Sequence, residues 1–399
     1  MTKIKTNRNN TNNVPHLRFP EFSGEWEKNN LSKFSSKITK KNKGNVIQNV
    51  LCNSANLGII PQNDYFDRDI ANADNTDSYY IIEHGDFVYN PRKSTAAPYG
   101  PVNIYNGEKP GIISPLYLCF SVLNISPSFL FYRFKSSVWH PYVYSHGDTG
   151  VRFDRVSIKD DVFFDMPIYT PTQNEQEKIA TLLSLIDERI ATQNKIIEKL
   201  ETLIKAIGNK CLFGHGRNVR LGDILIERTE KSTINDQYEI LSSTIKGIFS
   251  QRNYFSKDIA SENNIGYKIL HKGDIVLSPQ NLWMGNINYN DKFDFGIVSP
   301  SYKVFAISKE FDCLYVAFLL KTHRSLYSYR SISEQGASIV RRNLNMDAFL
   351  ELTFKIPPFV AQRQIGQALS KLSDKIEMER DCLNMLKAQK QYLLSHLFI

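Results

Sequence analysis

Cysteine is scarce and scattered in this 399-residue chain, and long apolar runs are missing. None of the five cysteines forms a C-x-x-C pair, which argues against a zinc finger or a thioredoxin-like centre. Their sparse, odd number is typical of a reducing cytoplasm. No stretch approaches the ~20 apolar residues that a membrane-spanning helix needs. Residues 1–15 are polar and Asn-rich, without the apolar core of a signal peptide, so we expect a disordered tail and a cytoplasmic protein with no membrane partner.

Sequence motifs for chemistry are missing as well. No G-x-G loop follows a strand to cradle a nucleotide or S-adenosylmethionine, and no Walker A, H-E-x-x-H or G-x-S-x-G motif occurs. The eight histidines show no metal-ligand spacing. Residues 356–359 (IPPF) are similar to the Asn/Asp-Pro-Pro-aromatic motif of adenine-N6 methyltransferases, but Ile356 cannot accept the hydrogen bond that the motif's polar residue makes. We interpret this string as the start of a helix, and we expect no catalytic residue, metal or cofactor in this chain.

The chain does carry an excess of positive charge, with a formal net charge of +8 and a pI near 9.0. This excess is diffuse rather than gathered in Lys/Arg runs, so a simple basic tail is excluded. It has two interpretations, solubility alone or a polyanionic partner, of which nucleic acid is the commonest. The length suffices for two or three compact domains.

The sequence repeats itself once. Residues 81–91 (IIEHGDFVYNP) match residues 269–279 (ILHKGDIVLSP) at an offset of 188, and residues 111–120 match residues 296–305 at an offset of 185. The matched blocks keep their order, which indicates a duplication. Gly85 and Gly273 within them are typical of turns before strands. We therefore predict an α+β fold with two tandem mixed α/β globular units and a pseudo-twofold internal repeat.

A long segment with seven-residue periodicity follows each unit. Residues 173–213 contain no proline, and apolar residues recur there in two interleaved series, as they do again after residue 364. Two such stripes in one chain most simply pack on each other as an antiparallel coiled coil. Gln193 and Glu379 interrupt both stripes at the same place, either as a buried polar pair that fixes the register or as solvent-facing residues. The predicted seam residues are Ile179, Leu183, Ile186, Ile190, Ile197, Leu200 and Ile204 in the first helix and Ile365, Leu369, Leu372, Ile376, Leu383, Leu386 and Leu393 in the second.

Several strings in this order resemble the specificity subunits of Type I restriction–modification systems. They are residues 15–26 (PHLRFPEFSGEW), residues 171–176 (PTQNEQ) and residues 219–224 (VRLGDI), and the resemblance covers nearly the whole chain. The second copy of the helix start has Ala361 where the first has Glu175. The resemblance implies target-recognition domains at residues 16–171 and 217–355, and spacer helices at residues 172–214 and 356–399.

The resemblance also implies a function and partners. Each domain would read one half of an asymmetric bipartite target in double-stranded DNA. The helices would set the gap and dock two copies of a methylation subunit, and motor–endonuclease subunits would complete the complex. S-adenosylmethionine, ATP and Mg would be bound by those partners. The alternatives are a solitary or phase-variable specificity protein, an intrinsic methyltransferase, and a coiled-coil scaffold that binds no DNA.

Candidate DNA-reading residues come from loops that occupy the same place in the repeat but differ in sequence. One pair is residues 90–95 and 278–285, and a second pair is residues 146–152 and 333–342. Arginine is suited to guanine, and Asn or Gln to adenine. Arg152 and Arg341 match at an offset of 189. The candidates are Arg92, Lys93, Ser94, Arg152, Arg155, Gln280, Asn281, Arg341 and Arg342.

Overall fold

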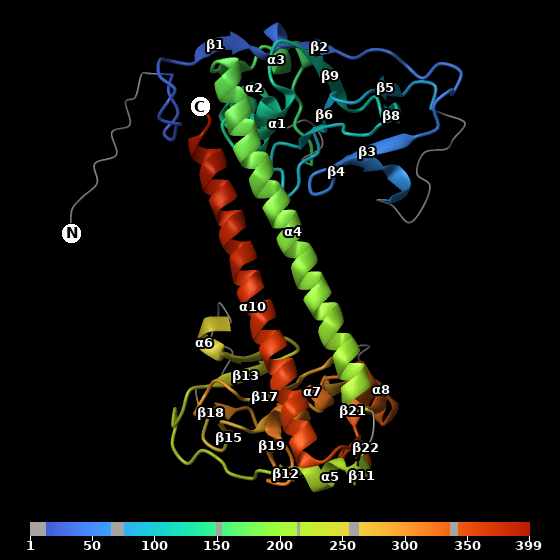
Figure 1. The fold of residues 1–399 in the computed structure, drawn as a ribbon, viewed down its shortest axis with the longest axis vertical. Helices are drawn as coiled ribbons and strands as arrows, with labels where there is room; N and C mark the ends of the chain where they lie inside the picture. Colours follow the sequence, from blue (N-terminus) through green and yellow to red (C-terminus); the bar gives the residue numbers. More distant parts are fainter. Residues whose placement is uncertain (1–12, 65–75, 149–153, 214–215, 255–262, 336–341) are drawn as a thin grey trace, which may run out of the picture. The chain divides into compact units, whose positions relative to one another are not determined.

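The computed structural model describes residues 13–64, 76–148, 154–213, 216–254, 263–335 and 342–399 (Figure 1). Its internal contacts divide the chain into two compact units. The first unit comprises residues 1–192 and 383–399, and the second unit comprises residues 193–382. Both boundaries fall inside long helices, so each helix contributes to both units. Among the helices of the described ranges, none is both long and apolar enough to cross a membrane.

The first unit is built on two four-stranded sheets. One sheet is antiparallel, with strands in the order β2-β9-β6-β7, and the other has the order β4-β3-β8-β5 with β3 and β8 parallel. The strands are β1 (Glu27–Asn30), β2 (Ser35–Lys37), β3 (Val50–Ser54), β4 (Gly58–Pro61), β5 (Tyr80–Ile82), β6 (Phe87–Tyr89), β7 (Val102–Ile104), β8 (Gly111–Ile113), β9 (Leu118–Val122) and β10 (Pro167–Thr170), of which β1 pairs with β10. The helices are η1 (Leu31–Lys33), η2 (Gln62–Asp64), α1 (Pro127–Lys135), α2 (His140–His146) and α3 (Asp160–Phe164).

The second unit repeats the antiparallel sheet of the first, with the order β12-β19-β16-β17. Its other strands form pairs, β11 with β22, β13 with β14, β15 with β18 and β20 with β21. The strands are β11 (Arg217–Arg220), β12 (Leu225–Glu227), β13 (Leu241–Thr244), β14 (Gly247–Ser250), β15 (Lys268–His271), β16 (Ile275–Leu277), β17 (Ile287–Tyr289), β18 (Phe295–Val298), β19 (Lys303–Ile307), β20 (Ser333–Gln335), β21 (Arg342–Leu344) and β22 (Thr353–Ile356). The helices are α5 (Leu221–Ile224), α6 (Gln251–Tyr254), η4 (Leu282–Met284), α7 (Cys313–Leu320), α8 (His323–Ser331) and α9 (Met346–Glu351).

The residues shared by the two repeats explain the common sheet. Gly85 and Gly273 adopt φ angles of 89° and 92°, a left-handed conformation that favours glycine, and each turns the chain into a buried strand, β6 or β16. In the first unit Phe87 of β6 stacks on Phe120 of β9 at 5.3 Å between ring centroids. The mixed α/β fold predicted from the sequence is confirmed, and so are the strands expected after both glycines.

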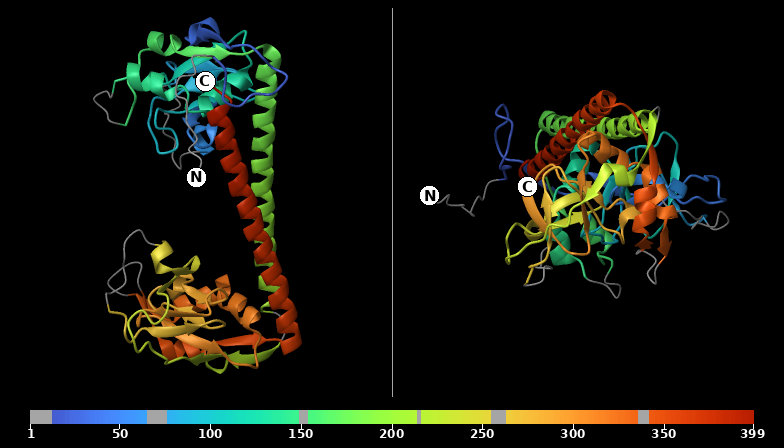
Figure 2. Two further views of the ribbon diagram at one scale, coloured as in Figure 1. Left: turned by 90° about the vertical axis from the view of Figure 1, so that its left-hand side faces the viewer. Right: turned by 90° about the horizontal axis from the view of Figure 1, so that it is seen from below.

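Each unit holds the start of one long helix beside the end of the other (Figures 1 and 2). These helices are α4 (Gln173–Cys211) and α10 (Phe359–His396). In the first unit Ile179 and Leu183 share a hydrophobic core with Leu393. In the second unit Ile204 packs against the core that contains Leu369. Every residue of the predicted seam is buried or half-buried.

Gln193 and Glu379 meet in the second unit. The Gln193 amide donates to the backbone carbonyl of Glu379 at 3.0 Å and also to its carboxylate. Gln193 is only 8% exposed. The ammonium group of Lys375, 2.5 Å from the Glu379 carboxylate, is the main reason why the pKa of that carboxyl is lowered, and Gln193 adds to the effect. Of the two interpretations of this polar position, the structure supports the polar pair, with Gln193 buried and Glu379 half-buried.

A glutamine near the start of each long helix ties that helix to its globular unit. Gln176 donates to the carbonyl of Pro171 at 3.0 Å and accepts from the backbone N–H of Ser126 at 2.9 Å. Gln362 makes the same two bonds, to Pro357 at 2.9 Å and from Asp312 at 3.0 Å. Because Ser126 and Asp312 are the N-cap residues of α1 and α7, the glutamines connect two helix starts in each unit.

Candidate nucleic-acid interface

In the first unit the structure brings the two predicted loops together. The backbone N–H of Lys93 donates to the carbonyl of Asp154 at 2.8 Å, and that of Val156 donates to the carbonyl of Pro91 at 2.9 Å. Arg92 and Arg155 therefore lie opposite each other on paired backbone segments. Two stretches that are about sixty residues apart in the sequence thus form one surface feature.

The candidate side chains of this feature differ in exposure. The Arg92 guanidinium is 68% exposed and lies 3.6 Å from the Asp154 carboxylate. Lys93 is half-buried and Ser94 is exposed, in a tight turn closed by backbone bonds between Ser94 and Ala97 at 3.0 and 3.1 Å. The Nε atom of half-buried Arg155 is shielded from solvent and has no hydrogen-bond partner among the described residues. Such an unpaired donor is costly unless a ligand satisfies it.

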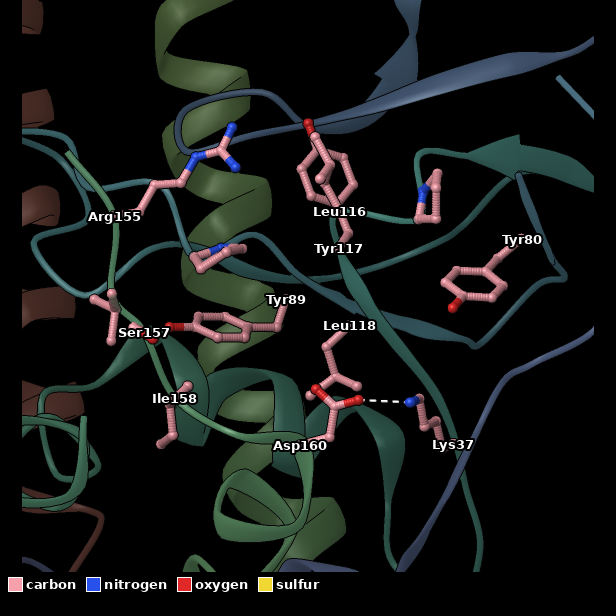
Figure 3. Close-up of a pocket in the computed structure, with 13 residues that line it drawn as sticks. Lys37, Tyr80, Tyr89, Leu116, Tyr117, Leu118, Arg155, Ser157, Ile158 and Asp160 are labelled. Atoms are coloured by element: carbon pink, nitrogen blue, oxygen red, sulfur yellow. Dashed lines mark ion pairs between the residues drawn. The ribbon is translucent and has the colours of Figure 1, made fainter. Parts of the chain in front are cut away.

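A cavity of about 420 Å³ opens beside Arg155 (Figure 3). Its wall carries three tyrosines, Tyr80, Tyr89 and Tyr117, together with Pro91 of the first loop. Lys37 and Asp160 form an ion pair at 2.5 Å on another wall, and the hydrogen bond to Asp160 is the main cause of a raised Lys37 pKa. Aromatic faces and cationic groups suit a nucleotide or a DNA backbone better than they suit an apolar ligand.

The second unit repeats the arrangement with different side chains. The backbone N–H of Arg342 donates to the carbonyl of Gln280 at 3.1 Å, which joins the loop before η4 to strand β21. The Arg342 guanidinium also donates to the carbonyl of Ser333 at 2.6 Å. Its Nε atom is buried without a partner among the described residues, like that of Arg155, and so is Oδ1 of half-buried Asn281. Gln280 is exposed.

Two of the candidates, Arg152 and Arg341, lie outside the described residues. The backbone bond to the first loop is donated by Val156 in the first unit and by Arg342 in the second. Each unit thus carries an arginine, Arg155 or Arg342, in the segment that pairs with its first loop. This pairing was not evident from the sequence because the surrounding loop differs in both length and composition.

The structure places a further helix beside the predicted loops of each unit, α2 in the first unit and α8 in the second. In the second unit α8 contacts η4 of the first loop, and the Arg330 guanidinium lies 5.6 Å from the centroid of the Trp283 ring. In the first unit α2 leads directly into the second loop, where Asp148 and Ser157 exchange two backbone bonds of 2.8 Å. The signal in the sequence was a short repeat, HPYVYS at residues 140–145 and HRSLYS at residues 323–328.

Metal-ligating side chains are not clustered in the part of the chain that the structure describes. Within those ranges no three His, Cys, Asp or Glu side chains are grouped so that they could hold a metal ion. The interface instead offers guanidinium, amide and hydroxyl groups on loops that a sheet positions. These are the groups that contact phosphates and base edges in DNA.

Comparison with known proteins gives a family match for the second part of the chain. Residues 217–388 match the family described as "Type I restriction modification DNA specificity domain". No curated protein matches the chain in sequence.

Two solved structures share the fold. One is a chain of a type I R-M system, with a TM-score of 0.54 and 14% identity over 96% of this chain and 99% of that chain. The other is the S subunit of the Type-I restriction-modification system from M. genitalium, with a TM-score of 0.56 and 14% identity over 97% of this chain and 99% of that chain. The resemblance predicted from the sequence is confirmed. Residues 217–388 match the family model of the Type I restriction modification DNA specificity domain, and over nearly its whole length the chain shares the fold of these two solved structures.

Proposed function

We propose that this chain is the DNA-reading subunit of a Type I restriction–modification complex, and that each unit reads one half of a bipartite target. The observation that carries the proposal is the repeated loop pair. In both units backbone bonds join the two loops, which carry Arg92 and Arg155 in the first unit but Gln280 and Arg342 in the second. A scaffold kept while its surface residues change is expected of two readers with different targets.

The side chains fit base reading in the major groove. Arginine bonds the O6 and N7 acceptors of guanine with two parallel donors, whereas Gln and Asn bond the N6 and N7 atoms of adenine. Because the units carry different sets of these groups, the target is asymmetric. Phosphate contacts from Lys93 and Arg92 would hold the first unit in register without selecting a sequence.

The two long helices serve as the spacer in this proposal, packed as an antiparallel coiled coil. Helix α4 has 39 residues and is about 58 Å long at 1.5 Å per residue. That length suffices to hold two readers one helical turn of DNA apart, ~34–36 Å. The buried pair of Gln193 and Glu379 would fix the register of the helices.

The same helices would dock two copies of a methylation subunit. The seam residues are covered within the chain, so docking falls to other faces, where α4 exposes Leu185, Ile196 and Leu203. S-adenosylmethionine, ATP and Mg would be bound by the methylation and motor–endonuclease subunits. This chain would act in the bacterial cytoplasm without catalysing a step itself.

Methylome sequencing of cells with and without the gene tests the proposal. We expect a split adenine-methylated motif that disappears on deletion and returns with the complementing gene. Purified chain alone should transfer no methyl group, and methyl transfer by it would identify an intrinsic methyltransferase. An absence of duplex binding, even with cognate methylation subunits, would favour a scaffold and contradict the proposal.

A further inference from the structure

Both units expose a tyrosine at the same place. Tyr144 in α2 is 76% exposed and Tyr327 in α8 is 74% exposed, so neither ring contributes to a core. The two helices differ at neighbouring positions. Helix α2 has Pro141 and Tyr142 where α8 has Arg324 and Ser325. Packing therefore does not explain why tyrosine recurs. The residues that match at an offset of 183 are His140 and His323, Tyr144 and Tyr327, and Ser145 and Ser328.

Each tyrosine stands on the helix that adjoins the candidate reading loops of its unit. Helix α2 ends at His146, and the chain then pairs through Asp148 with Ser157, two residues after Arg155. Helix α8 contacts η4 and is followed by β20, which pairs with β21 so that Gln335 lies opposite Arg342. Each tyrosine thus lies on a helix next to the reading loops of its unit and is exposed there.

A comparison of which residues are identical in the two units and which differ indicates what the tyrosines contact. Base-reading residues must differ between two units that read different sequences, as Arg92 and Gln280 do. A residue that is identical in both units belongs with contacts that carry no sequence information, and in DNA those are contacts to phosphate and sugar. A tyrosine hydroxyl is a hydrogen-bond donor suited to a phosphate oxygen. Exposed cationic groups of the same units, Arg92 in the first loop of the first unit and Arg324 in α8 of the second, favour the same polyanionic backbone.

We propose that Tyr144 and Tyr327 each donate a hydrogen bond from the phenol hydroxyl to a phosphodiester oxygen, one beside each half of the target. These two contacts set the orientation of each unit on the duplex so that the loops reach the base edges. The inference rests on the proposed function and assigns a positioning role to residues outside the reading loops.

The variants Tyr144→Phe, Tyr327→Phe and the double variant test it, because each removes only the hydroxyl. The full chain with its methylation subunits is titrated with two 40-base-pair duplexes, one of random sequence and one carrying the methylome-derived target. Each single variant should lower the affinity for both duplexes by about three- to tenfold, and the effects should multiply in the double variant because the sites are separate. The slope of log K against log salt should stay unchanged, since tyrosine is neutral, whereas Lys93→Ala should reduce it by about 1.

Leu123→Ala and Ile226→Ala serve as matched controls. Both side chains are exposed, at 64% and 56%, and both lie at the end of the sheet away from the loops. This placement follows from the register. Strand β9 pairs Leu118 with Tyr89 and runs away from the loop toward Leu123, and β12 places Ile226 opposite Ala306, away from the pair of Leu277 and Lys303 next to the loop. These controls should bind both duplexes like the unaltered chain.

The outcomes separate the two proposals. If the unaltered complex binds neither duplex, the proposed function fails and the tyrosine contacts fail with it. If it binds and the Phe variants bind equally well, only the tyrosine inference is overturned. A loss confined to the target duplex would make the tyrosines base readers, and weaker association with the methylation subunit at unchanged DNA affinity would make them protein contacts; either result contradicts the inference.

Discussion

Arg155 and Arg342 each lie in the segment that pairs with the first loop of their unit. Both Nε atoms are buried without a partner among the described residues. A buried guanidinium N–H without a partner is costly, so an additional acceptor near it would be stabilising. Backbone bonds hold the segment of each arginine to the first loop, from Val156 to Pro91 in the first unit and from Arg342 to Gln280 in the second.

Replacing Arg155 by lysine tests whether its fork geometry matters. Lysine keeps the charge but loses the pair of parallel donors that recognises guanine. We therefore expect Arg155→Lys to leave the affinity for a random duplex nearly unchanged and to lower discrimination at one position of the first half-site by about 1–3 kcal/mol. Competition binding with single-base variants of the target measures this. Arg189→Lys, on an exposed face of α4, is the control, and equal losses on random and target duplexes would show that Arg155 contacts phosphate.

Gln280 gives a complementary prediction for the second unit. Gln280→Ala removes an exposed amide suited to adenine, so the methylated motif should become degenerate at one position of one half while the other half stays intact. Methylome sequencing of cells that carry the variant records both halves at once. Gln367→Ala, which removes an exposed glutamine of α10 in the same unit, should leave the motif unchanged. Degeneracy in both halves would contradict the division of reading between the units.

At the scale of single elements, the helix starts show what the sequence could and could not predict. The repeat revealed Gln176 and Gln362 as equivalent, but their bonds to Ser126 and Asp312 join segments fifty residues apart, and no local pattern encodes such contacts. The periodicity predicted both long helices correctly, because a seven-residue apolar repeat is a local signal. The periodicity did not decide whether Gln193 is buried, because the burial of this side chain depends on its contacts with Glu379 of the facing helix.

The start of α4 carries an ion pair that the second copy lacks. The Glu175 carboxylate, 1% exposed, accepts two bonds of 2.8 Å from Arg18 and one of 3.4 Å from Trp26. Glu175→Ala leaves these donors unpaired, so we expect the free energy of unfolding of the first unit to fall by about 3 kcal/mol. Urea denaturation followed by tryptophan fluorescence measures the change.

The matched control is Glu177→Ala, which removes an exposed carboxylate from the same turn of α4. A surface change of this kind should alter stability by no more than about 0.5 kcal/mol. If both variants lower the free energy of unfolding equally, the ion pair between Arg18 and Glu175 contributes no more to stability than an exposed ion pair.

At the scale of the whole molecule, the duplication provides the two related units between which the proposed reading of the target is divided. Composition and repeat together predicted a mixed α/β protein with two related units, and the antiparallel sheet orders β2-β9-β6-β7 and β12-β19-β16-β17 agree with it. The reading surface was predicted only in part. Loops 90–95 and 278–285 stood out because they differ within a repeat, whereas their pairing with Arg155 and Arg342 arises from tertiary contacts that span sixty residues.

If the helices measure the gap in the target, lengthening both should lengthen the gap. Inserting one heptad into the middle of α4 and one into the middle of α10 keeps the seam in phase and adds about 10 Å of rise. Because stacked base pairs are about 3.4 Å apart, the unspecified gap should grow by about three base pairs while both half-sites stay the same. Methylome sequencing reads the new spacing directly. A single heptad inserted in α4 alone shifts its apolar stripe by seven residues relative to that of α10 and should abolish methylation. An unchanged gap in the doubly lengthened chain would show that the helices do not set the spacing.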